Sequence, residues 1–308
     1  MLPNIYLTGS YLKYSEPEPL RKQPRDSFTN FYADLLALKN RDLDYESLFL
    51  GDQLNFSELG DLIFQDLDLQ KVLKKSQLLT CAFWSHEFDQ DHACGAYFVD
   101  KYQLSATVTD LTDCGNLSPF LGMHSIATYL INQNINQNIN QNKNQNKNFE
   151  KIKQAVLLVP ESTTIPYSKN DGYPVFANAL KSGAMAMSFS STPSDNAIRV
   201  MAIEVVETSK SDESNKNSLE KILKKLPAYL TRGQISLPLV LKEKFNKNNL
   251  FPVSYRASSG CLSTCAEIHH FFHDSHNSTQ EFLLLIEQNM ESPELIYGLL
   301  LIREQQNV

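Results

Sequence analysis

The pattern of apolar and polar positions predicts that strands and helices alternate along this chain. Short runs rich in β-branched and aromatic residues predict strands, whereas apolar residues spaced three and four apart predict helices that cover a sheet. By these criteria the strands lie at 4–8, 80–84, 106–112, 155–160, 184–190, 198–206, 282–286 and 295–302. The helices lie at 56–73, 119–131, 218–230 and 261–272.

This alternation predicts an α/β protein with a mostly parallel sheet. A polar tract at 132–148, built from Asn, Gln, Ile and Lys, interrupts the pattern near its middle. Only two residues of the tract are apolar, so it buries too little surface to offset the entropy of ordering it. We therefore expect two α/β halves, residues 1–131 and 149–308, joined by a disordered loop at 132–148. Their similarity indicates an internal duplication.

Composition narrows the range of functions and locations. The formal net charge is −7, from 28 Lys and Arg against 35 Asp and Glu, which argues against nucleic acid as a partner. The sequence has no apolar run of membrane-spanning length and no cationic-then-apolar leader, so we expect neither a membrane span nor export. Five cysteines do not form a disulfide framework in a 308-residue chain, and this predicts a cytoplasmic location.

The turn after the strand at 106–112 holds the most suggestive chemistry. Cys114 lies between the end of that strand and a helix that begins near Ser118-Pro119. The positive end of a helix dipole lowers the pKa of a nearby thiol, so Cys114 is a candidate nucleophile. The alternative is a small buried cysteine without chemistry, and the neighbouring carboxylate of Asp113 favours it because a negative charge opposes the thiolate.

A second group of candidate residues recurs at intervals of four: Cys261, Cys265, His269 and His273. On a helix these four positions share one face but extend over about 18 Å, too far to surround one ion. The acidic and histidine-containing segment 86–92 also lacks the pattern of a calcium loop. We therefore expect no metal site.

Five segments, in order along nearly the whole chain, carry a family resemblance. They are residues 5–12 (IYLTGSYL), the strand, turn and helix at 106–130, 175–186 (VFANALKSGAMA), 260–268 (GCLSTCAEI), and the closing pair 282–286 and 296–302. They resemble motifs of the thiolase-like superfamily, and most of all its β-ketoacyl synthase III branch. The resemblance implies two duplicated βα halves in a layered αβαβα arrangement, and no cofactor.

The same resemblance shows what this sequence lacks. Active members use a Cys nucleophile, a His, and the Asn of a Gly-Asn-Thr motif. Here Cys261 stands in place of that Asn, and no histidine lies between residues 198 and 260. Counted from Asp110, the family spacing puts Gly115 rather than Cys114 at the nucleophile position. Catalytic groups act as a unit, so a lone cysteine retains little condensing activity.

These departures resemble the non-catalytic subunits of heterodimeric condensing enzymes, such as the short subunit of alkylquinolone synthase. We therefore expect a subunit that pairs with a catalytic ketosynthase-III-like chain in acyl, polyketide or alkylquinolone-type biosynthesis and shapes or stabilises its acyl site. The partner chain would bind acyl-CoA or acyl carrier protein. Two alternatives remain: a divergent acyltransferase in which Cys114 accepts the acyl group, and a homodimer that binds an acyl ligand without reacting.

Overall fold

A computed structural model describes most of the predicted elements. The residues it describes are 5–16, 21–22, 30, 33–34, 37–38, 49–50, 54–84, 93–112, 114–141, 154–162, 182–194, 197–207, 231–242, 251–256, 261–274, 279–288 and 295–303. The helix predicted at 218–230 lies outside these residues.

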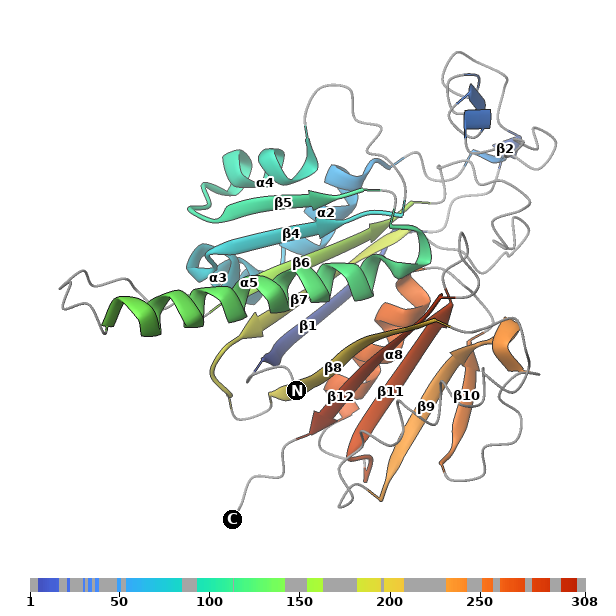
Figure 1. Cartoon of the computed structure of the whole chain (residues 1–308). Coiled ribbons are helices and arrows are strands. Elements are labelled where there is room, and N and C mark those ends of the chain that lie inside the picture. Colours follow the sequence, from blue (N-terminus) through green and yellow to red (C-terminus); the bar gives the residue numbers. More distant parts are fainter. Residues whose placement is uncertain are drawn as a thin grey trace.

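A ten-stranded sheet forms the centre of the described structure, in the order β10-β9-β11-β12-β8-β1-β7-β6-β4-β5. Its strands are β1 (Tyr6–Tyr14), β4 (Leu78–Ala82), β5 (Thr107–Leu111), β6 (Gln154–Glu161), β7 (Gly183–Ser190), β8 (Ile198–Glu207), β9 (Gly233–Pro238), β10 (Val253–Arg256), β11 (Phe282–Gln288) and β12 (Leu295–Arg303). Figure 1 shows them side by side, with β5 at one end of the sheet and β10 at the other. Two short strands, β2 (Arg21–Lys22) and β3 (Phe49–Leu50), pair separately.

Strand order reveals the duplication directly. In the first half, β1, β4, β5, β6 and β7 are the first to fifth strands along the chain. Counted from the edge of the sheet to its middle, they lie in the order 3-2-4-5-1. Strands β8 to β12 are the first to fifth strands of the second half, and counted from the other edge they lie in the same order. In both halves the pairs 3-2 and 2-4 are parallel, and the pairs 4-5 and 5-1 are antiparallel. The two first strands, β1 and β8, pair antiparallel and join the halves.

Two sequence predictions change as a result. The sheet is mixed, not mostly parallel, because the fifth strand of each half runs back against the fourth and the first strand pairs with it in antiparallel fashion. The repeat of strands divides between β7 and β8, which lies after the division predicted at 132–148. The tract at 132–148 begins inside a helix of the first half (Ser118–Gln141) and does not separate the halves.

The helices that pack on the sheet are α2 (Phe56–Phe64), α3 (Leu67–Lys75), α4 (Cys94–Tyr102), α5 (Ser118–Gln141) and α8 (Cys261–His273). The single helix predicted at 56–73 is in fact two, because the carboxylate of Asp66 accepts hydrogen bonds from the backbone N–H groups of Asp68 and Leu69 and starts a new helix. The sequence pattern missed α4, β9 and β10.

Helix α5 extends further than predicted. It continues to Gln141, ten residues beyond the expected end at Ile131 and well into the polar tract. The tract contains no Gly or Pro to stop a helix, and Gln has a good helix propensity, so a helix begun on packed residues continues through it. Residues 142–148 lie outside the described residues, and the loop expected there stays a prediction.

Helices α5 and α8 occupy equivalent places, because each follows the third strand of its half and leads to the fourth. Helix α5 packs on β4, β5 and β6, whereas α8 contacts strands of both halves, namely β1, β6, β7 and β11 (Figure 1). The two helices also contact each other. Their beginnings define the site described next.

Candidate active site at two helix N-termini

The turn before α5 meets the first residue of α8. The thiol of Cys261 donates a hydrogen bond to the carbonyl oxygen of Gly115 over 3.2 Å. The structure thus places the turn that holds Cys114 and Gly115 against Cys261.

The turn itself is held to the end of β4. The backbone N–H of Cys114 donates to the carbonyl of Phe83 (3.0 Å), and that of Gly115 donates to the carbonyl of Trp84 (2.9 Å). The hydroxyl of Ser118, the first residue of α5, closes the turn by donating to the carbonyl of Gly115 over 2.8 Å. These bonds fix the backbone where a nucleophile would be presented.

Gly115 is the bent residue of this turn. Its φ is +56°, in the left-handed region, and a Cβ added to it would meet no atom of the described part of the chain within 4 Å. Nucleophiles at strand-to-helix turns are presented from such a bent backbone into open space. The position with that geometry is therefore Gly115, which has no side chain.

The thiol of Cys114 does not share the position of Gly115 but faces a groove beside the turn. This thiol donates to the carbonyl of Thr112 over 3.6 Å and is partly exposed. It lines a groove of about 600 Å³ between β5 and α5, together with α5 residues such as His124 and Thr128. Cys114 is thus reachable from solvent through this groove. Asp113 lies outside the described residues.

The two cysteines of α8 are fully buried. Burial, and after it the nearby carboxyl of Glu161, raise the pKa of Cys261 and Cys265 well above the usual range of a thiol. Both stay protonated at neutral pH, so neither is a thiolate nucleophile. Cys261 acts here as a hydrogen-bond donor to the turn.

Glu161 is a site residue that the sequence interpretation missed. It is the last residue of β6 and only 4% exposed, and its Oε2 accepts a hydrogen bond from the backbone N–H of Leu262 over 2.7 Å. Its Oε1 is buried and has no hydrogen-bond partner among the described residues. Burial raises the pKa of Glu161 to about 7, although the bond from Leu262 opposes this. The signal in the sequence was an acid ending an apolar strand.

The second half supplies the opposite side of the site. The side-chain amide of Asn116 donates to the carbonyl of Gln288, at the end of β11, over 2.8 Å. Beside it, Glu287 forms a buried ion pair with Arg256 (2.8 Å, each side chain 2% exposed). The guanidinium of Arg256 also donates to the hydroxyl of Ser236 and the carbonyl of Ile286. The end of β6 therefore bonds the start of α8, and the end of β11 bonds the turn before α5.

Within the described residues, no three or more His, Cys, Asp or Glu side chains are grouped so that they could hold a metal ion. Segment 86–92 lies outside that part of the chain. None of the described helices, including the 24-residue α5, combines the length and the apolar character needed to cross a membrane.

Known proteins share this architecture but little of the sequence. No protein-family model and no curated protein sequence matches the chain. A crystal structure of a variant of Xanthomonas campestris OleA superposes with a TM-score of 0.61 at 13% identity and covers 98% of both chains. The tetronic acid condensing enzyme AbyA1 gives 0.60 at 8% identity, over 97% of this chain and 100% of that one.

A further OleA variant, crystallised with lauric acid and lauroyl-CoA, gives a TM-score of 0.59 at 11% identity and covers 99% of this chain and 100% of its own. The chain therefore has the mixed α/β fold of thiolase-like condensing enzymes, as the sequence motifs predicted.

Proposed function

We propose that this chain is a degenerate subunit with a condensing-enzyme fold, which pairs with a catalytic ketosynthase-III-like chain and supports that chain's acyl site. The observation that carries the proposal is Gly115. The turn keeps the bent strand-to-helix backbone that presents a nucleophile in condensing enzymes, here called the elbow, but it has no side chain at the bent residue. Cys261, at the position of the family's Asn, is buried and protonated.

The surface beside the turn suits pairing with another chain. Strand β5 is the last strand of the described sheet, so one side of its backbone carries hydrogen-bonding groups that no neighbouring strand of the sheet pairs. The groove between β5 and α5, which Cys114 lines, runs along the same edge. A partner strand added there would extend the sheet and bring the partner close to the turn.

Co-expression with a ketosynthase-III-like chain from the same source tests the pairing. We expect a stable one-to-one complex by size-exclusion chromatography with light scattering. The double variant His124→Glu/Thr128→Glu puts two carboxylates on the groove face of α5 and should abolish the complex. Lys74→Glu, an exposed change on α3, is the matched control and should leave it intact. A monodisperse monomer under the same conditions would overturn the proposal.

The second candidate function is acyl acceptance by Cys114, because its partly exposed thiol lines an open groove. Intact-protein mass spectrometry after incubation with acyl-CoA distinguishes the two. The subunit proposal expects no stable adduct on the wild-type chain, whereas the second candidate expects one that Cys114→Ser removes. Gly115→Cys places a thiol at the bent residue, and an adduct formed only in that variant would show that the acceptor position survives without its nucleophile.

A further inference from the structure

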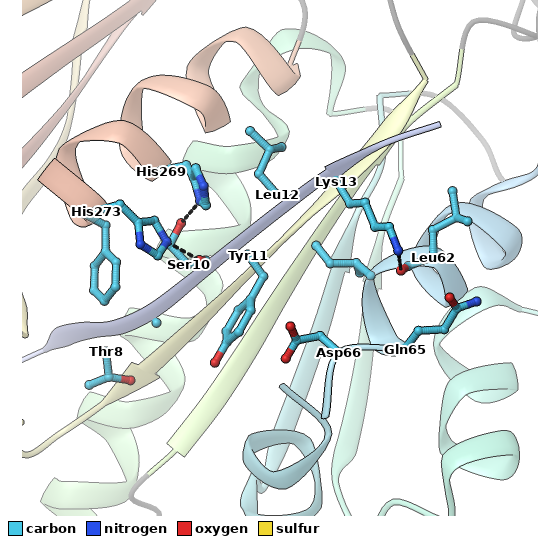
Figure 2. A pocket seen from close by; sticks show the side chains of 13 residues that line it. Thr8, Ser10, Tyr11, Leu12, Lys13, Leu62, Gln65, Asp66, His269 and His273 are labelled. Atoms are coloured by element: carbon cyan, nitrogen blue, oxygen red, sulfur yellow. Dashed lines mark hydrogen bonds between the residues drawn. The ribbon is translucent and has the colours of Figure 1, made fainter. Parts of the chain in front are cut away.

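A second cavity lies away from the two helix N-termini, along β1. It has a volume of about 760 Å³ and is bounded by residues 8–13 of β1, the junction of α2 and α3, and the C-terminal part of α8. This volume is in the range of small-ligand sites. Figure 2 shows His269 and His273 on α8 pointing toward Ser10 on β1, with Asp66 on the opposite wall.

Ser10 holds both imidazoles. Its hydroxyl is 3.0 Å from Nδ1 of His269, and its carbonyl oxygen accepts a hydrogen bond from Nε2 of His273 over 2.9 Å. A carbonyl can only accept, so Nε2 of His273 carries the proton and Nδ1 keeps its lone pair in the neutral ring. For His269 the nitrogen not used by Ser10 is Nε2. Metal-binding histidines are held in this way, with one nitrogen bonded to a protein oxygen and the other available.

We propose that His269 and His273 bind one divalent transition-metal ion of the Ni²⁺ or Cu²⁺ type. The two residues lie four apart on α8, and their ring centroids are 4.3 Å apart. An ion bound at about 2.1 Å from a nitrogen lies about 3.2 Å from that ring's centroid, so two rings 4.3 Å apart are close enough to share one ion. Imidazole nitrogen is a good ligand for both Ni²⁺ and Cu²⁺.

The form of the cavity also favours binding of an ion. The cavity is open, and the protein supplies two ligands in the described residues, so water or a small ligand completes the coordination. This arrangement is that of an exchangeable site and not of a closed structural one.

Isothermal titration of the full-length, tag-free chain with Ni²⁺ tests the site, because Ni²⁺ does not oxidise the exposed thiol of Cys114. Glycine in the buffer suppresses weak surface binding. We expect one ion per chain, and a loss of affinity of at least tenfold in His269→Ala and in His273→Ala. The second variant changes an exposed residue and tests the site even if the first fails to fold.

Matched variants separate the site from general histidine binding. His270→Ala, on the same helix but exposed, should change the affinity less than twofold, as should the double variant His86→Ala/His92→Ala. Ser10→Ala removes the bond to Nδ1 of His269 and should weaken binding about tenfold. Ser10→Thr keeps the hydroxyl and should restore binding. The proposal is overturned by the absence of one-to-one binding, or by binding that survives in the double variant His269→Ala/His273→Ala.

Discussion

Glu161 and Glu287 lie near the ends of β6 and β11, the fourth strands of the two halves, and both are buried, but their surroundings differ. Glu287 is paired with Arg256, whereas Glu161 accepts one backbone hydrogen bond from Leu262 and forms no ion pair among the described residues. Burial raises the pKa of both carboxyls, and Arg256 opposes that rise at Glu287. A duplicated framework thus keeps a fixed charge pair in one half and a group that titrates near neutrality in the other.

The largest change in the free energy of unfolding is expected when the ion pair between Glu287 and Arg256 is broken. Glu287→Gln leaves the guanidinium of Arg256 buried without a counter-charge, and removing one partner of a buried ion pair costs about 3–5 kcal/mol. Urea unfolding at pH 7 measures this loss. The loss should persist in high salt, because salt screens buried charges weakly. A loss below about 1 kcal/mol would show that the pair does not hold β11 to β10.

Glu161→Gln is expected to change the dependence of stability on pH. The folded pKa of about 7 is raised above the ordinary value of 4.5, so the protonated form favours folding. The corresponding stability is complete below pH 4.5 and is lost as the pH rises through 7. Between pH 4.5 and 8 the variant should therefore gain about 3 kcal/mol relative to the wild type.

Urea unfolding of both chains at four pH values gives this difference. Replacing Glu161 by an amide has a cost that does not depend on pH, and this cost cancels when the wild type and the variant are compared across the pH range. Glu281→Gln is the control, because Glu281 lies outside the site, just before β11. The pKa of Glu281 is lowered by hydrogen bonds from the backbone N–H groups of Thr231 and Arg232, so its variant should show the opposite trend. If the free energies of unfolding of wild type and Glu161→Gln change with pH in the same way, Glu161 does not titrate near neutrality in the folded chain.

A smaller effect is expected at the bond that links the turn to the second half. Asn116→Ala removes the buried donor to the carbonyl of Gln288, which is expected to cost about 1–2 kcal/mol. Ser118→Ala removes a bond within the turn and serves as the matched control. If pairing with a second chain depends on the turn, Asn116→Ala should also weaken the co-expressed complex, and Ser118→Ala should weaken it less.

Much of the fold could be predicted from the sequence, because its strands are local apolar runs. The segments at 155–160, 184–190 and 295–302 were each found within a residue or two of their observed limits. The mixed direction of the sheet could not be predicted in this way, since periodicity says which residues form a strand but not which way its neighbour runs. The repeat became visible only in the order of the strands.

The site was predicted less completely. Cys114 and Cys261 were identified from the motifs, and the hydrogen bond from Cys261 to Gly115 places them together. Glu161 was missed because its importance comes from burial beside the start of α8, about a hundred positions later in the chain. The two histidines of α8 were identified as a spacing only. Their orientation comes from Ser10 on β1, a long-range contact that no local pattern reveals.

The smallest expected effect is at Gly115 itself, and it tests why this position has glycine. A Cβ there meets no atom of the described residues within 4 Å, so Gly115→Ala creates no clash with them and its cost comes from the backbone. A φ of +56° costs an L-residue about 1–2 kcal/mol, and the smaller entropy of the unfolded chain without this glycine offsets about 0.4–1 kcal/mol of that cost. Gly115→Asn should cost less than Gly115→Ala although its side chain is larger, because Asn adopts left-handed backbone more readily. Urea unfolding of the two variants side by side gives the order. If Asn costs more than Ala, space and not backbone conformation limits this position, and the elbow would then have no room for the side chain of a nucleophile.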